Sequence, residues 1–124
     1  MFEFPKKQRL CNAAAIKQIF SEGDSFVFDT IRLVWREVES LDSVAIKSII
    51  VVPKKQLRLA AERNIVKRRM KEAYRLNKGE IDLFLEEKNR KIHIAIIYQN
   101  NKILSYKVIE EKIKLILGRL REKI

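Results

Sequence analysis

The chain has 124 residues, a length that fits one domain, and its 47% apolar content excludes a disordered or fibrous protein. Lysine and arginine number 27 against 16 aspartates and glutamates, which gives a formal net charge of +11. An excess of that size predicts a polyanionic partner, first a nucleic acid and second an anionic membrane. A single cysteine, Cys11, and a single histidine, His93, exclude a disulfide framework, a zinc finger and a multi-histidine metal site.

No membrane association is expected. The longest apolar stretches, around Ile49–Val52 and Ile94–Tyr98, are far shorter than the roughly 20 residues that a membrane span needs. Met1–Asn12 contains basic residues but no apolar core, so we do not expect a secretory signal there. We predict a reduced, cytoplasmic protein made of a single domain over residues 1–124, with an irregular basic segment at 1–11.

The first predicted element is a short helix. Asn12 is a good N-cap for a helix from Ala13 to about Ser21. Gly23 stands where a residue in the left-handed conformation would end that helix. Three apolar residues fall at helical spacing on one face: Ile16, Ile19 and Phe20.

Two strands are predicted next. Phe26–Val38 is rich in β-branched and aromatic residues and predicts a strand that is interrupted or bent near Asp29–Thr30. After a turn at 40–43, Val44–Val52 predicts a second strand that is buried on both faces, and Pro53 ends it.

The second half predicts a long basic helix over Leu59–Leu76, a short extra helix at Ile81–Glu87 and a third strand at Ile92–Tyr98. Ser105 caps a final amphipathic helix that extends to about Arg121. The main elements therefore follow in the order α-β-β-α-β-α. That order predicts an α/β two-layer sandwich, with helices packed on one small sheet.

The basic helix concentrates the charge. Residues 54–78 contain ten basic residues and two acids, a net charge of +8 in one-fifth of the chain. On a helical wheel, one continuous face contains Arg63, Asn64, Lys67, Arg68, Lys71 and Arg75. Another face carries the apolar residues Val66, Met70 and Ala73. Opposite charges usually alternate along a solvated helix, so a face almost free of acids favours contact with nucleic-acid phosphates. The alternative interpretation is that this basic face is simply an exposed helix surface in contact with solvent.

No residue is predicted to be catalytic. The sequence has no nucleophile–base pair, no glycine-rich phosphate loop and no usefully spaced pair of carboxylates. We interpret His93 as a structural residue and Cys11 as an inert thiol. Phe20, Val34 and Trp35 are candidates for packing on an unpaired base, although a role in the core is the better interpretation for most of them.

An ordered set of motifs resembles the bacterial ribonuclease P protein subunit. The stretch AERNIVKRRMKEAYR, Ala61–Arg75, resembles the family's signature helix, an Arg-Asn-Arg core followed by Lys-Arg and an Ala-aromatic pair. Val51–Lys55 resembles the strand end and Lys-Lys pair that precede this helix. Arg9–Leu10, Phe20 and Gly23 match the family's spacing of Arg-Leu, Phe and Gly. The resemblance covers most of the chain.

The resemblance implies a left-handed βαβ crossover, a fold shared with a domain of a ribosomal protein. It also implies an accessory subunit of an endoribonuclease, whose RNA subunit is the catalyst and holds the Mg²⁺ ions. The protein is expected to contact that ribonuclease P RNA and the 5′ leader of precursor tRNA. It is expected to bind no cofactor tightly and to be monomeric, with one copy per RNA.

The residue-level expectations follow by position. The predicted RNA-binding residues are Lys54, Lys55, Arg63, Asn64, Lys67, Arg68, Lys71 and Arg75. Phe20 matches an aromatic residue of the leader cleft, and Ile16 and Val34 stand where the family often has aromatics, so apolar packing is expected there. Ile65 replaces the second arginine of the signature, so one RNA contact is expected to be lost or shifted to Arg69.

Three other interpretations stay open at this point. A ribosomal or ribosome-assembly protein shares the charge but has no reason to carry the ordered motifs. A small nuclease that acts alone would need an acid–base or metal constellation. A helix-turn-helix DNA-binding protein fits poorly with strands on both sides of a single basic helix.

Overall fold

The computed structural model describes residues 9–10, 12–39 and 43–124. Its elements, in chain order, are α1 (Ala13–Glu22), β1 (Asp24–Phe28), β2 (Ile31–Val38), β3 (Ile46–Val51), α2 (Ala60–Asn77), α3 (Gly79–Glu87), β4 (Lys91–Tyr98) and α4 (Tyr106–Lys123). Most of the predicted irregular segment 1–11, including Cys11, and most of the predicted turn at 40–43 lie outside the described residues.

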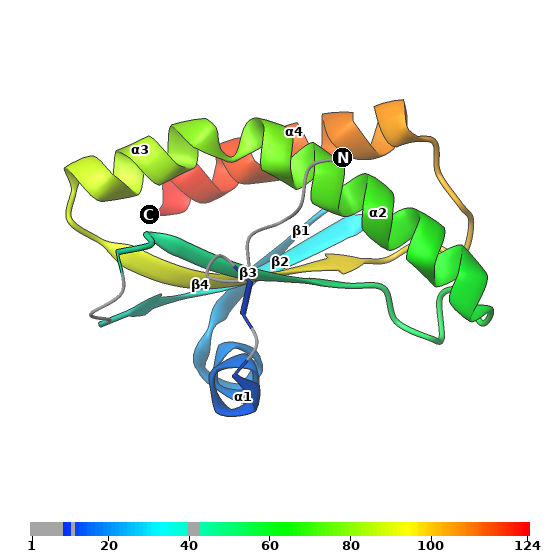
Figure 1. Cartoon of the computed structure of the whole chain (residues 1–124), viewed down its shortest axis with the longest axis horizontal. Coiled ribbons are helices and arrows are strands. Elements are labelled where there is room, and N and C mark those ends of the chain that lie inside the picture. The colour runs from blue at the N-terminus through cyan, green and yellow to red at the C-terminus, as the bar shows by residue number, and fades with distance from the viewer. Residues whose placement is uncertain (1–8, 11, 40–42) are drawn as a thin grey trace.

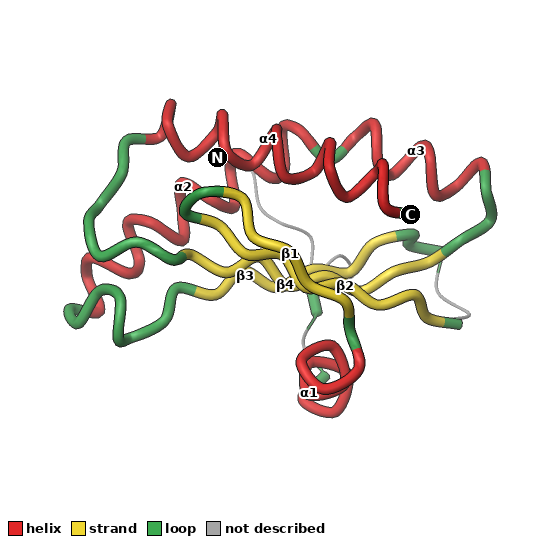
Figure 2. The backbone as a smooth tube through the Cα atoms, turned by 180° about the vertical axis from the view of Figure 1, so that it is seen from behind, coloured by secondary structure: helices red, strands yellow, loops and turns green. Residues whose placement is uncertain are grey.

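The four strands form one sheet in the order β1-β2-β4-β3. β1 pairs with β2, and β2 with β4, in antiparallel register, whereas β3 and β4 are parallel. α2, α3 and α4 cover one face of this sheet, and α1 lies alone against the other face (Figures 1 and 2). The predicted α/β sandwich is confirmed. The parallel pair is joined through α2 and α3, the crossover that the resemblance describes as left-handed.

Successive side chains of each strand point to opposite faces of the sheet, and this produces two hydrophobic cores of unequal size. On β4, Ile92, Ile94 and Ile96 face the three helices and belong to the main core. Ala95 and Ile97 face the opposite way and pack with Ile19 of α1 and Val34 of β2 in the smaller core. α2 joins the main core through Val66, Met70, Ala73 and Tyr74. The predicted apolar stripe of the basic helix is therefore confirmed.

One predicted strand is a hairpin. Phe26–Val38 was expected to be a single bent strand, but β1 and β2 pair with each other through a turn at Asp29–Thr30. Asp29 takes the left-handed conformation there, with φ at 56°. Aspartate tolerates that conformation better than most residues, which makes it a suitable turn residue without glycine. With the short helix α3 as expected, the observed order is α-β-β-β-α-α-β-α.

Gly23 ends α1 for a different reason from the one predicted. Its φ of −78° and ψ of 157° are extended, so the left-handed conformation expected there is wrong. A Cβ atom at this position would lie 2.4 Å from the Ile19 carbonyl oxygen and 2.8 Å from that of Trp35. Glycine is required because the chain between α1 and β1 passes very close both to the last turn of α1 and to β2.

Candidate nucleic-acid interface

The basic face of α2 is exposed along most of its length. Asn64, Arg68 and Lys71 are exposed and Lys67 is half-buried. Among the described residues, no carboxylate forms an ion pair with Lys67, Arg68 or Lys71. Because these three cations lack an internal counter-charge there, the face can bind the phosphates of a nucleic acid at little cost in broken contacts.

Arg63 lies in the first turn of this helix and is tied to the preceding loop. Its Nη1 donates hydrogen bonds to the carbonyl oxygens of Leu57, at 2.9 Å, and Arg58, at 2.8 Å. Leu59, the N-cap residue, provides no side-chain hydrogen bond to the helix. Arg63 therefore holds the loop against the start of α2, so its first role is to position the loop.

That loop carries the predicted pair Lys54 and Lys55. Both are exposed in a turn closed by hydrogen bonds to the Pro53 carbonyl, from Gln56 N at 3.0 Å and Leu57 N at 3.4 Å. The Leu57 side chain is buried in the main core and anchors the turn. The turn thus holds two exposed lysines in the loop that leads into α2.

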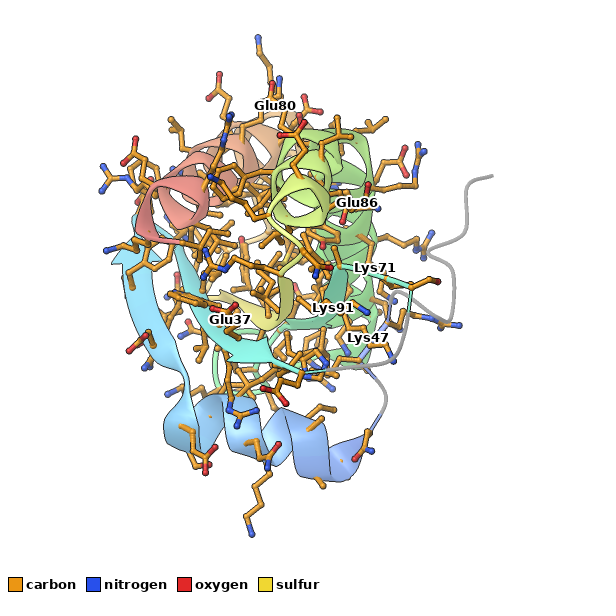
Figure 3. All side chains as sticks on the ribbon, turned by 90° about the vertical axis from the view of Figure 1, so that its left-hand side faces the viewer. Glu37, Lys47, Lys71, Glu80, Glu86 and Lys91 are labelled. Atoms are coloured by element: carbon orange, nitrogen blue, oxygen red, sulfur yellow. The ribbon has the colours of Figure 1, made fainter. Side chains whose placement is uncertain are left out.

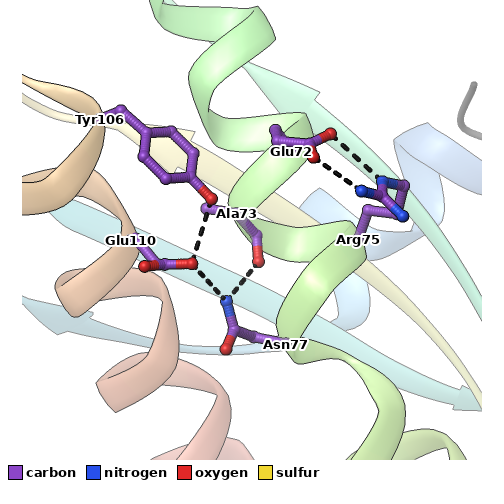
Figure 4. A network of polar contacts seen from close by, with 6 residues as sticks. All are labelled: Glu72, Ala73, Arg75, Asn77, Tyr106 and Glu110. Atoms are coloured by element: carbon purple, nitrogen blue, oxygen red, sulfur yellow. Dashed lines mark hydrogen bonds and ion pairs between the residues drawn. The ribbon is translucent and has the colours of Figure 1, made fainter. Parts of the chain in front are cut away.

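The C-terminal part of the basic face is internally paired (Figure 4). Arg75 donates two hydrogen bonds to the Glu72 carboxylate, Nη2 to Oε1 at 2.7 Å and Nε to Oε2 at 3.2 Å. This contact holds the pKa of Glu72 below its ordinary value and raises the pKa of Arg75. The predicted RNA-binding residue Arg75 thus has a carboxylate partner, unlike Arg68 and Lys71.

A second set of contacts in Figure 4 fixes α2 against α4. Asn77 Nδ2 donates to the Ala73 carbonyl at 2.7 Å and to Glu110 Oε2 at 3.4 Å, and the Tyr106 hydroxyl donates to the same Glu110 oxygen at 3.0 Å. Burial, followed by the Glu110 carboxylate, raises the pKa of Tyr106. These contacts fix the position of the C-terminal end of α2 against the start of α4.

Arg69 lies toward α4. One of its guanidinium nitrogens donates to the Leu104 carbonyl at 2.6 Å, so it helps to hold the segment before α4. It is therefore poorly placed to replace the contact expected to be lost at Ile65. Ile65 itself is 37% exposed, beside the basic face.

The apolar candidates divide by the face of the sheet on which they lie. Phe20, on α1, is 50% exposed, whereas Val34, on β2, is 3% exposed. Ile16 packs against the small core that contains Val34. Ile16, Phe20 and Val34 therefore belong to the α1 side of the sheet. Trp35 packs against the main core on the other side, so it does not share this surface with them.

Arg9 joins this interface although it is not among the predicted RNA-binding residues. Arg9 forms a parallel bridge with Ser48 at the outer edge of β3, and Leu10 N donates to the Ser48 carbonyl at 2.8 Å. This pairing brings Arg9 to a pocket of about 140 Å³ beneath the basic face of α2. The pocket, which we call the β3-edge pocket, is lined by Arg9, Leu10, Ser48, Ile49, Ile50, Lys67 and Lys71. The Arg9–Leu10 motif in the sequence could have indicated that Arg9 takes part in this interface.

Within the described residues, no group of three or more histidine, cysteine, aspartate or glutamate side chains could hold a metal ion. No described helix is long and apolar enough to cross a membrane. His93 is half-buried in β4, opposite Arg36 of β2 and Lys47 of β3 in the sheet register. The interface described here is therefore built from cations and apolar surface.

Comparison with known proteins gives a consistent result. The family model described as Ribonuclease P matches residues 4–121. A relative named "Ribonuclease P protein component", from Porphyromonas gingivalis, is 35% identical over 120 residues, which cover 96% of this chain and 87% of the relative.

Solved structures agree on the fold. The RNase P protein from Thermotoga maritima superposes with a TM-score of 0.71 at 25% identity, covering 90% of this chain and 96% of that one. The RNase P protein of Staphylococcus aureus also superposes with a TM-score of 0.71, at 20% identity, covering 91% of this chain and 94% of that one.

Proposed function

Because the chain belongs to the ribonuclease P protein family, we propose that it binds the ribonuclease P RNA and the 5′ leader of precursor tRNA. It thereby assists removal of the leader to give the mature tRNA 5′ end. The observation that carries this proposal is the row of cations on α2 without carboxylate partners among the described residues.

The proposed binding mode uses two surfaces. Lys67, Arg68 and Lys71 neutralise RNA phosphates along α2, and Lys54 and Lys55 extend this surface through the loop that Arg63 holds in place. Because two polyanions repel each other, a cationic surface between them lowers the concentration of Mg²⁺ needed to bring them together. The catalytic Mg²⁺ ions are proposed to be held by the RNA, and no step is assigned to a side chain of this protein.

The leader is proposed to lie on the α1 side of the sheet. Phe20 offers a half-exposed aromatic ring on which an unpaired base can stack. Ile16 and Val34 offer apolar packing instead of further aromatic rings. Because Val34 is almost fully buried, its contribution is limited to the floor of the surface, and Phe20 is the principal contact.

A reconstitution tests the proposal. The purified protein is mixed with a bacterial ribonuclease P RNA and a 5′-extended precursor tRNA, at a Mg²⁺ concentration too low for the RNA alone. We expect leader release only when protein and RNA are both present. A protein that binds RNA without stimulating cleavage would instead be a ribosome-associated protein, and cleavage by the protein alone would indicate an independent nuclease.

Variants then separate the two surfaces. Arg68→Glu should weaken RNA binding and flatten its salt dependence by about one unit per lost phosphate contact, whereas Lys107→Glu, an exposed site on α4, should change the slope little. Phe20→Ala should weaken binding of precursor tRNA more than mature tRNA. Equal losses for both tRNAs would contradict the assignment of Phe20 to the leader.

A further inference from the structure

The β3-edge pocket joins residues that are far apart in the sequence. Arg9 comes from the segment before α1, Ser48 from β3, and Lys67 and Lys71 from α2. The apolar residues Leu10, Ile49 and Ile50 complete its lining. Figure 3 shows Lys71 above the outer strand, on the same side of the molecule as Lys47 of β3.

The charges around this pocket all have the same sign. Arg9, Lys67 and Lys71 line it, and none of the seven lining residues is acidic. Lys67 and Lys71 are four residues apart on one helix, a spacing at which like charges destabilise the helix. Among the described residues, none of the three cations has a carboxylate partner. An anion in the pocket would relieve the repulsion within this cluster.

The position of Arg9 is fixed by the backbone. Its bridge to Ser48 and the hydrogen bond from Leu10 N to the Ser48 carbonyl hold this segment as a short extension of the sheet. The Leu10 side chain is buried in the small core, which secures the same segment from below. One wall of the pocket is thus tied to the sheet, and the opposite wall is a turn of α2. An anion bound here would connect the two.

We propose that the β3-edge pocket binds one phosphate group, and that in the RNA complex this group is a backbone phosphodiester. A guanidinium and two ammonium groups around a small space suit a compact anion with several oxygen atoms, and they repel a metal cation. The identity of the phosphate as part of an RNA rests on the proposed function. The presence of a phosphate site does not, because the protein alone can be tested for it.

The first experiment titrates the protein with inorganic phosphate at low salt, followed by isothermal titration calorimetry. Sodium chloride at equal ionic strength is the control. We expect saturable binding with one site per chain. Lys71→Gln and Arg9→Gln should each weaken it about tenfold, as expected for the loss of one charge-assisted contact. Arg68→Gln removes the same charge from the same helix outside the pocket, and it should weaken phosphate binding less than about twofold.

Thermal unfolding without phosphate shows that the variants are folded. Lys71→Gln removes one of two repelling lysines, so its Tm should equal or exceed that of the parent protein. Absence of saturable phosphate binding, or equal losses for Arg68→Gln and Lys71→Gln, would overturn the site.

The second experiment identifies the source of the phosphate. An RNA oligonucleotide without terminal phosphates should displace inorganic phosphate, and Lys71→Gln should reduce the salt slope of RNA binding by about one unit. Displacement only by a 5′-phosphorylated oligonucleotide would overturn the backbone assignment, since a terminal monoester would then be the ligand. Phosphate binding by a protein that binds no RNA would overturn the proposed function while leaving the site intact.

Discussion

Replacing Gly23 by alanine tests the close passage of the chain between α1 and β2. The new Cβ atom would lie 2.4 Å from the Ile19 carbonyl oxygen and 2.8 Å from the Trp35 carbonyl oxygen, against about 3.3–3.6 Å for an ordinary carbon–oxygen contact. Both atoms belong to the backbone, so neither can rotate away; the last turn of α1 must open by up to about 1 Å and the end of α1 must move away from β2.

The change in unfolding free energy caused by Gly23→Ala is a balance of two effects. Overpacking costs about 1–3 kcal/mol, and two clashes with backbone atoms place this site in the upper part of that range, at about 2–3 kcal/mol. The loss of glycine's freedom in the unfolded chain returns about 0.4–1 kcal/mol. We expect Gly23→Ala to lose about 1–2.5 kcal/mol of unfolding free energy, and to lower Tm by about 5–10 °C. Because the shift displaces α1, the preference for leader-bearing tRNA should also fall, while RNA binding through α2 persists.

Gly118→Ala is the matched control, because the Cβ at this position of α4 would meet nothing within 4 Å. Alanine is the better helix former, so this variant should gain about 0.5–1 kcal/mol. The two variants are compared by thermal and urea unfolding. If Gly23→Ala is as stable as the parent protein, α1 is not held against β2 in the way described, and the reason given for this glycine is wrong.

Three further predictions concern single contacts. Ile19→Ala should cost about 2–5 kcal/mol by urea unfolding, whereas Phe20→Ala should cost less than about 1 kcal/mol, and equal losses would contradict their assigned exposures. Arg63→Ala should lose about 1–2 kcal/mol and speed tryptic cleavage in the loop that carries Lys54, whereas a rate equal to that of Arg68→Ala would refute the positioning role. The Arg90 hydrogen bonds hold the pKa of Glu37 below its ordinary value of 4.5, so the ion pair stabilises the fold above that pH and the effect is lost as the pH falls further. Glu37→Gln should therefore lower the free energy of unfolding at pH 7 by at most about 1 kcal/mol, with a slightly lower Tm. The difference in Tm between the variant and the parent protein should disappear in thermal scans below pH 4. A difference that is unchanged at pH 3 would refute this role of Glu37.

Periodicity and capping residues predicted the helices well. Asn12 and Ser105 accept hydrogen bonds from backbone N–H groups as expected, and Val66, Met70 and Ala73 are buried. These features depend on residues within a few positions of each other, so they can be recognised without knowing the tertiary structure. The existence of the β-rich segments was predicted for the same reason.

The misses depended on distant contacts. The hairpin at Asp29 lacks the Asn-Gly or Asp-Gly signal of a two-residue turn, so a bend was the natural interpretation. The role of Gly23 depends on the approach of β2, twelve residues later in the chain at Trp35. The placement of Arg9 beside Lys71 likewise required the three-dimensional structure. The pairing of Arg75 with Glu72 is the exception, because the two residues are three positions apart on one helix, a spacing from which an ion pair can be predicted. The RNA-binding roles of the α2 residues stay predictions.

The central position of β4 has a consequence for how the protein is made. β4 is the last strand in the sequence, yet both β2 and β3 pair with it. During translation, β1 and β2 can form their hairpin early, but β3 has no strand partner until residues 91–98 have been synthesised. Closing so long a loop is slow compared with local pairing. The basic helix α2 is therefore synthesised before the strand that completes the sheet beneath it, and a nascent chain carries the concentrated positive charge of α2 before β3 has a strand partner.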